Sequence, residues 1–290
     1  MISESLQRHL EETLGKRIYT SRPVSGGDIN HASMLEMEDG STYFLKYHSG
    51  SDSDMFEKEK RGLGVLRTHA VGIIVPEVTA VGFAKGPNVG YLVMQFIPAG
   101  TPDALFYQKF GSSLAALHKV SNKNFGLDHD NYIGRLPQSN RRHSTWTDFF
   151  IQERLEPQIE MAVDGGQLSG SIHKNFNQLY KELPSLFPEE PPALLHGDLW
   201  SGNFMCSNQK EPVLIDPAVY YGHREAELAF TQLFGRFDDR FYRAYEESYP
   251  LNNGFPIRKD VYNLYPLLVH TNLFGGSYAY QVKSYLARFI

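Results

Sequence analysis

The spacing of apolar residues changes at residues 98–102 (PAGTP), and this change restricts the chain to two dissimilar halves. Before it, short runs rich in aromatic and β-branched residues lie between turn residues, a pattern typical of strands. After it, apolar residues recur at helical spacing, as from Leu105 to Leu117. Proline and glycine cluster in connections between elements. We therefore expect an α+β fold with a small β-rich N-terminal lobe, residues 1–97, and a larger, mostly helical C-terminal lobe, residues 98–290.

The first half predicts a sheet with two helices. Asp39-Gly40 separates two strand-like runs, which is a strong hairpin signal. The expected strands are 17–24, 31–38, 41–47, 78–83 and 91–97, and the expected helices are 1–15 and 53–69. In the second half we expect helices at 146–163 and 172–183, within 225–249, and from 259 to the end. Two short apolar runs, 194–195 and 213–215, resemble buried strands that frame a loop.

The composition excludes several classes of protein. A chain of 290 residues with a net charge of −5 is a poor candidate for binding nucleic acid, because phosphate contacts need a basic surface. No stretch approaches 18 apolar residues and the first 14 lack the apolar core of a signal peptide, so we expect no membrane partner. The single cysteine, Cys206, excludes a disulfide framework and Cys-rich metal sites, and it suits the reducing cytoplasm.

The loop between the two short apolar runs carries the clearest chemical signal. It has the sequence LHGDLWSGN and places Asn203 five residues after Asp198. This is the spacing of the protein-kinase catalytic loop, in which the Asp accepts the proton of the attacking hydroxyl and the Asn holds a metal ion. Asp216 follows at the end of an apolar run, and two oxygen ligands suit Mg²⁺. An HGD triplet alone is more typical of a simple turn, but these offsets favour Asp198 as a catalytic base.

The N-terminal half supplies a candidate pair for positioning phosphates. Lys46 ends an apolar run, where an unpaired lysine is costly to bury. Glu59, thirteen residues later on a predicted helix, is the natural partner. We prefer it to Glu57 because it lies seven residues before Leu66 on that helix. Such a Lys–Glu pair positions the α- and β-phosphates of ATP. Taken alone, a surface lysine and a solvated acidic helix face would be the simpler interpretation.

A turn of small residues, Ser25, Gly26 and Gly27, lies between the first two expected strands. It lets backbone N–H groups approach phosphates, although no Walker sequence follows and a plain hairpin loop is the alternative. The order along the chain is small-residue loop, Lys, Glu, linker, Asp–Asn and Asp. This order favours a kinase that uses ATP and Mg²⁺.

Four segments resemble the fructosamine kinase (ketosamine-3-kinase) family. They are residues 195–203, residues 215–229, the pattern FExExxGL at 56–63, and DNYIG at 130–134 with Gln138, Asn140 and Trp146 after it. The resemblance covers nearly the whole chain and implies a protein-kinase-like fold. It also implies transfer of the ATP γ-phosphate to the sugar 3-hydroxyl of a fructosyl- or ribulosyl-amine. The unstable 3-phosphate is then eliminated, and the amine is freed.

The same resemblance implies roles for further residues. Gln95, Phe96 and Ile97 would form the hinge that contacts adenine, although glutamate is common at the first of these positions. Trp200 would stack on the sugar-amine substrate. Asp28 stands where some relatives have a loop cysteine, so redox regulation through a disulfide in that loop is not expected.

Two other functions stay open on the sequence. The catalytic core is shared with aminoglycoside phosphotransferases and choline kinases, so the acceptor could be a different small molecule. A catalytically inactive nucleotide-binding module is the second alternative. The complete set of candidate residues argues against inactivity, namely Lys46, Glu59, Asp198, Asn203 and Asp216.

Overall fold

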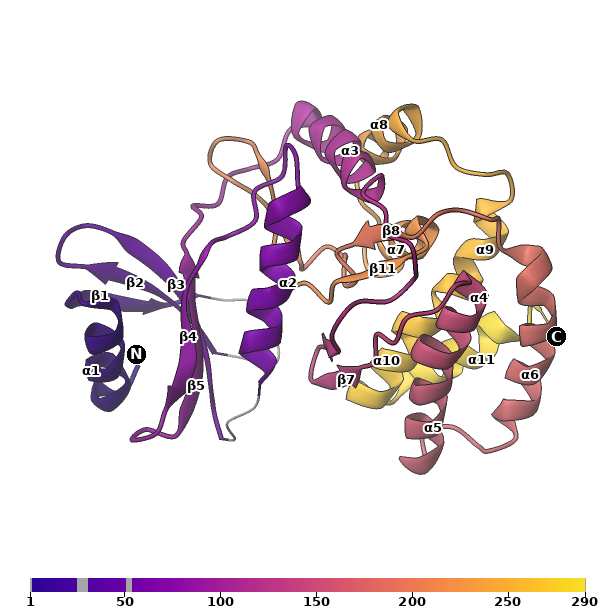
Figure 1. Ribbon diagram of the computed structural model, residues 1–290, viewed down its shortest axis with the longest axis horizontal. Coiled ribbons are helices and arrows are strands. Elements are labelled where there is room, and N and C mark those ends of the chain that lie inside the picture. Colours follow the sequence, from indigo (N-terminus) through magenta and orange to yellow (C-terminus); the bar gives the residue numbers. More distant parts are fainter. Residues whose placement is uncertain (1, 25–30, 51–53, 290) are drawn as a thin grey trace.

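The computed structural model describes residues 2–24, 31–50 and 54–289, which form two lobes (Figure 1). The N-terminal lobe is built on an antiparallel sheet with the strand order β1-β2-β3-β5-β4. Its strands are β1 (Ile18–Pro23), β2 (His31–Met37), β3 (Thr42–Ser49), β4 (Val78–Ala84) and β5 (Val89–Gln95). The expected phosphate loop, Ser25, Gly26 and Gly27, lies outside the described residues, as does Asp28.

Two helices cover opposite faces of this sheet (Figure 1). The helix α1 (Glu4–Leu14) begins at the N-cap Ser3 and ends at Gly15, whose φ of 65° terminates the helix as the sequence predicts. The helix α2 (Met55–His69) lies between the sheet and the C-terminal lobe. Successive side chains of β5 enter the two cores in turn, as the alternation of a strand requires. The helix that carries Glu59 is therefore fixed to the sheet that carries Lys46.

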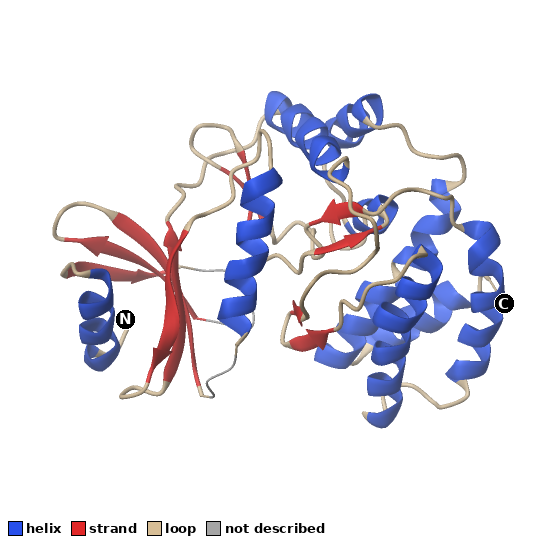
Figure 2. Cartoon of the chain, viewed as in Figure 1, coloured by secondary structure: helices blue, strands red, loops and turns tan. Residues whose placement is uncertain are grey.

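The C-terminal lobe is mainly helical and also contains short two-stranded sheets (Figure 2). Its helices are α3 (Ala104–His118), α4 (Trp146–Phe149), the π-helix η1 (Phe150–Leu155), α5 (Glu156–Asp164), α6 (Ile172–Leu186), α7 (Arg224–Phe230), α8 (Asp239–Ser248), α9 (Phe255–Tyr262), α10 (Leu264–Phe274) and α11 (Ser277–Leu286). Its strands are β6 (Asn131–Ile133), β7 (Leu136–Gln138), β8 (Ala193–Leu195), β9 (Phe204–Cys206), β10 (Pro212–Leu214) and β11 (Tyr220–Gly222). They pair as β6–β7, β8–β11 and β9–β10.

Several boundaries differ from the sequence prediction. The strand β5 ends at Gln95, so Phe96 and Ile97 belong to the connection between the lobes. The helical stretch expected at 146–163 contains a π-helical turn, in which Glu153 and Arg154 are both buried. The expected division at residue 97 falls in the connection between β5 and α3.

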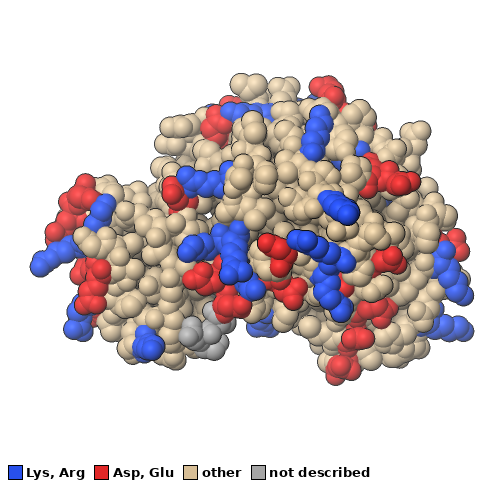
Figure 3. Space-filling model, viewed as in Figure 1, with Lys and Arg blue, Asp and Glu red and all other residues tan. Residues whose placement is uncertain are grey.

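The surface carries both signs of charge. Lys and Arg are interspersed with Asp and Glu on the face in Figure 3. Among the described residues, no helix combines the length and the apolar character needed to cross a bilayer.

Candidate active site

The hairpin β9–β10 brings Asn203 and Asp216 together. Antiparallel pairing sets Phe204 opposite Leu214, so the residues on either side of the hairpin meet at its open end. The N–H of Ile215 donates to the carbonyl of Asn203 at 3.1 Å. The separation of thirteen residues is thus closed by strand pairing. Asp216 itself has a φ of 56°, in the left-handed region that non-glycine residues seldom adopt.

A buried histidine joins this hairpin to the catalytic loop. His196 Nδ1 accepts from the N–H of Asp198 at 3.3 Å, so the ring proton lies on Nε2 and is donated to the carbonyl of Ile215 at 2.8 Å. Burial lowers the pKa of His196, which keeps the ring neutral and this tautomer in place. The histidine thus holds the loop of Asp198 against the strand that leads to Asp216.

Glu227 in α7 holds the other side of the loop. Its carboxylate accepts from the backbone N–H groups of Gly197 and His196 at 2.7 and 3.2 Å, and it contacts His118 Nε2 at 2.8 Å. Burial raises the pKa of Glu227, but the hydrogen bond and charge interaction with His118 outweigh this and the pKa lies below its ordinary value. The sequence alone predicted no role for Glu227 or His118. The one available signal was a glutamate on the apolar face of a predicted helix.

The carboxyl group of Asp198 is shielded and paired with Asn203. Asn203 Nδ2 donates to both the carbonyl oxygen and Oδ2 of Asp198, each at 2.8 Å. Burial raises the pKa of Asp198 well above its usual range, while the Asn203 amide opposes the rise. A carboxylate whose pKa is raised is a stronger base, and it is suited to take a proton from a hydroxyl group.

Lys46, in the sheet of the N-terminal lobe, contacts a carboxylate of each lobe. Its Nζ lies 2.8 Å from Glu59 Oε1 on α2 and also contacts Asp216 Oδ1. Burial lowers the pKa of Lys46, but the charges of Asp216 and Glu59 outweigh this and hold it above its ordinary value. The expected Lys46–Glu59 pair is therefore present, whereas Glu57 is exposed.

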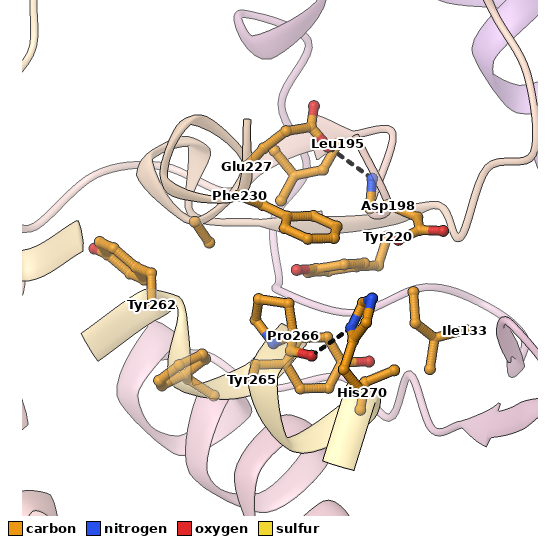
Figure 4. Close-up of a pocket in the computed structure, with 14 residues that line it drawn as sticks. Ile133, Leu195, Asp198, Tyr220, Glu227, Phe230, Tyr262, Tyr265, Pro266 and His270 are labelled. Atoms are coloured by element: carbon orange, nitrogen blue, oxygen red, sulfur yellow. Dashed lines mark hydrogen bonds between the residues drawn. The ribbon is translucent and has the colours of Figure 1, made fainter. Parts of the chain in front are cut away.

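These side chains line one cleft of about 440 Å³ between the lobes. Trp200 also lines it, and the indole lies over Gly202, where a Cβ would be 2.4 Å from the ring. A smaller pocket of about 30 Å³ shares Asp198 and His270 with the cleft and has Phe230 and Tyr220 among its walls (Figure 4). The cleft can therefore hold a ligand with its reacting group beside Asp198 and a flat part against Trp200.

The donor set at the base of the cleft fits a hard divalent cation. Asp216 supplies a carboxylate, and Asn203 uses its amide nitrogen on Asp198, which leaves the amide oxygen of Asn203 to act as a ligand. Magnesium prefers such oxygens and keeps water or phosphate in the rest of its shell.

The structure brings six sequence-predicted residues into the lining of this cleft and leaves three others outside it. Lys46, Glu59, Asp198, Asn203 and Asp216 line it together with Trp200. Gln95 ends β5 and Phe96 and Ile97 follow it in the connection between the lobes; none of the three is among the described residues that line the cleft.

Comparisons with known proteins point to one family. Residues 2–290 match the family model described as fructosamine kinase. A protein assigned as a ketoamine kinase in Enterococcus faecium is 38% identical over 270 residues, which cover 92% of this chain and 94% of that protein. The chloroplastic protein-ribulosamine 3-kinase of Arabidopsis thaliana is 38% identical over 261 residues, which cover 88% and 78%.

Solved structures agree with this assignment. A protein assigned as a fructosamine-3-kinase from Thermobifida fusca superimposes with a TM-score of 0.87 at 32% identity, over 99% of this chain and 98% of that one. Spectinomycin, macrolide and aminoglycoside phosphotransferases superimpose with TM-scores of 0.53 to 0.62 at 11 to 16% identity. At that distance the likeness shows a shared kinase-like fold alone.

Proposed function

Because the chain belongs to the fructosamine kinase family, we propose that it phosphorylates the sugar 3-hydroxyl of ketosamines with ATP and so leads to deglycation of amines or proteins. The observation that carries the proposal is the meeting of Lys46, Glu59, Asp198, Asn203 and Asp216 in one cleft. Residues 1–97 act as the nucleotide-binding lobe, and residues 98–290 act as the catalytic and substrate lobe. The protein works in the cytoplasm on free or protein-bound ketosamines.

The reaction is a direct, in-line phosphoryl transfer. Asp198 takes the proton of the sugar hydroxyl, whose oxygen bonds to the γ-phosphorus as the bond to the bridging oxygen of ADP breaks. Lys46, oriented by Glu59, holds the α- and β-phosphates. Asn203 and Asp216 would hold Mg²⁺, which when bound supplies charge neutralisation on the phosphates.

The remaining roles concern substrate binding. The loop of Ser25, Gly26 and Gly27 covers the phosphates. Gln95, Phe96 and Ile97 form the adenine hinge, which their place between the lobes supports. Trp200 stacks on the sugar amine, which its place in the cleft wall supports.

The test is ADP release by the purified protein with ATP and Mg²⁺. The acceptors are ribulosyl-lysine, fructosyl-lysine, kanamycin, choline and none, and Asp198→Asn is the control variant. We expect turnover with a ketosamine that is lost in the variant. Turnover with kanamycin or choline alone would replace the substrate class. Nucleotide binding without turnover of any acceptor would favour an inactive binding module.

A further inference from the structure

Three buried amide side chains, two in the hairpin β6–β7 and one shortly after it, have no part in the proposed reaction. Asn131, Gln138 and Asn140 are 7%, 2% and 1% exposed. Burying an amide is costly unless its polar atoms are paired. Their hydrogen-bond partners therefore show what this part of the chain holds in place.

Two of these amides hold the backbone that follows Asp216. Asn131 Nδ2 donates to the carbonyl of Val219 at 2.9 Å. Gln138 Nε2 donates to the carbonyl of Ala218 at 3.2 Å. Both carbonyls lie just after Pro217 in the chain. The two amides therefore hold the segment that directly follows the left-handed residue Asp216.

The same segment also packs on the catalytic loop. The N–H of Ala218 donates to the carbonyl of His196 at 2.9 Å. The carbonyl of Ala218 lies so close to Gly197 that a Cβ there would be 2.0 Å away. A shift of Ala218 would therefore disturb both the loop of Asp198 and the position of Asp216.

A buried arginine fixes which way the amide groups of Asn140 and Asn131 point. Arg154 Nη2 donates to Asn140 Oδ1 at 2.7 Å, and its guanidinium lies 4.0 Å from the centre of the Tyr220 ring. Asn140 Nδ2 and Gln138 Nε2 donate to Asn131 Oδ1 at 2.9 and 2.8 Å. If the Asn131 amide were flipped, its NH₂ group would face the NH₂ groups of Asn140 and Gln138, which are both donors. Asn131 Nδ2 must therefore face the carbonyl of Val219.

We propose that Asn131 and Gln138 are positioning residues for Asp216. Their amides fix the left-handed turn and so keep its carboxylate beside Lys46, ready for the divalent cation of the nucleotide. A left-handed aspartate costs free energy and persists only where its surroundings impose it. Partners of metal ligands commonly change metal affinity by about 10–100-fold. This inference rests on the proposed function, because it takes Asp216 as a metal ligand.

The experiment compares two matched glutamine variants. Gln138→Leu removes the donor to Ala218, whereas Gln158→Leu removes an equally buried glutamine in α5 whose side chain accepts from Asn272. A milder variant, Tyr265→Phe, removes only the hydroxyl that donates to Gln138 Oε1. The readouts are Mn²⁺ binding in the presence of a non-hydrolysable ATP analogue, measured by electron paramagnetic resonance, and the melting temperature.

We expect Gln138→Leu to weaken Mn²⁺ binding by about 10-fold or more, and Tyr265→Phe to weaken it by a few-fold. Gln158→Leu should lower the melting temperature and leave Mn²⁺ affinity unchanged. Unchanged affinity in Gln138→Leu and Tyr265→Phe, or equal weakening in Gln158→Leu, would overturn the inference alone. Absence of nucleotide-dependent Mn²⁺ binding in the unaltered protein would instead overturn the proposed function.

Discussion

Asp198 is a carboxyl group whose basicity is set by its surroundings. Burial raises its pKa well above the usual range, and the hydrogen bond from Asn203 to Oδ2 limits the rise, while the second bond from Asn203 holds the backbone carbonyl of Asp198. The neighbouring His196 and Glu227 hold the backbone of its loop from opposite sides. The position of Asp198 therefore depends on buried neighbours that hold the backbone of its loop.

Asp198→Asn tests the base directly. The amide keeps the shape of the side chain but cannot accept the proton, so we expect kcat to fall by about 10²–10⁴-fold. That change corresponds to roughly 3–5 kcal/mol in the activation barrier. The melting temperature should change little. Full kcat in this variant would contradict the role of Asp198.

The segments that carry the candidate catalytic and phosphate-positioning side chains were the ones that the sequence predicted best. The loop of Asp198, the strand of Lys46 and the helix of Glu59 carry local signals, because turn residues and apolar spacing fix their elements. The support beneath them gave no such signal. Glu227 and His118 meet over a separation of 109 residues, and only the packing of α7 against the loop makes them partners.

Among the elements, the helices α3 and α8 pack with their backbones in close contact. A Cβ on Gly111 of α3 would lie 2.1 Å from the carbonyl oxygen of Phe241 in α8. Backbone cannot yield as a flexible side chain would. The close packing of α3 against α8 thus depends on the absence of a side chain at Gly111.

Gly111→Ala should therefore destabilise the protein by about 1–3 kcal/mol, because overpacking forces the helices apart. Gly64→Ala is the matched control, since Gly64 lies within α2 and a Cβ there meets nothing within 4 Å. The control should be neutral or stabilising by about 0.5–1 kcal/mol, because alanine favours the helix. Urea denaturation measures both. Equal stabilities of the two variants would show that the helices can separate at little cost.

The start of α7 makes stability depend on pH. His223 is buried, and its Nδ1 accepts from the N–H of Glu225 as the helix N-cap. Burial lowers the pKa of His223, although the nearby Glu190 and Glu225 oppose this. The unfolded chain then binds more protons than the folded one below the ordinary histidine pKa of about 6.5. This contribution to stability is present above that pH and is lost as the pH falls.

His223→Asn keeps a capping side chain and removes the titration. We expect the free energy of unfolding to fall less steeply with decreasing pH below about 6.5, by up to about 1.4 kcal/mol per pH unit. The measurement is urea denaturation between pH 7.5 and 5, and absolute stabilities need not match. A slope identical to that of the unaltered protein would exclude His223 as a source of the dependence.

For the whole molecule, the two lobes are joined through the cleft as well as through the chain. Lys46 of the sheet contacts Glu59 of α2 and Asp216 of the C-terminal lobe. Tyr132 of β6 donates to Asp54 at the start of α2, at 2.7 Å. The nucleotide phosphates would therefore bind where the lobes already meet.

Lys46→Ala should impair turnover more than folding. Removing one preorganised charge commonly costs about 10²–10³-fold in kcat, and here it also leaves Glu59 and Asp216 facing each other without a cation. Lys60→Ala, at an exposed position of the same helix α2 that carries Glu59, is the control and should keep normal turnover. Steady-state kinetics with varied ATP would measure both. Unchanged turnover in Lys46→Ala would refute the phosphate-positioning role.

The burial of Cys206 in β9 gives this molecule a practical use as an optical sensor. The chain has no other cysteine, and this side chain is shielded, with burial raising the pKa of its thiol. The thiolate is the form that attacks thiol-labelling reagents, so the natural sulfur should stay inert at neutral pH. A cysteine introduced at the exposed position of Phe274, on the wall of the cleft, would then be the single labelling point. A fluorophore attached there would signal each arrival and departure of a ligand.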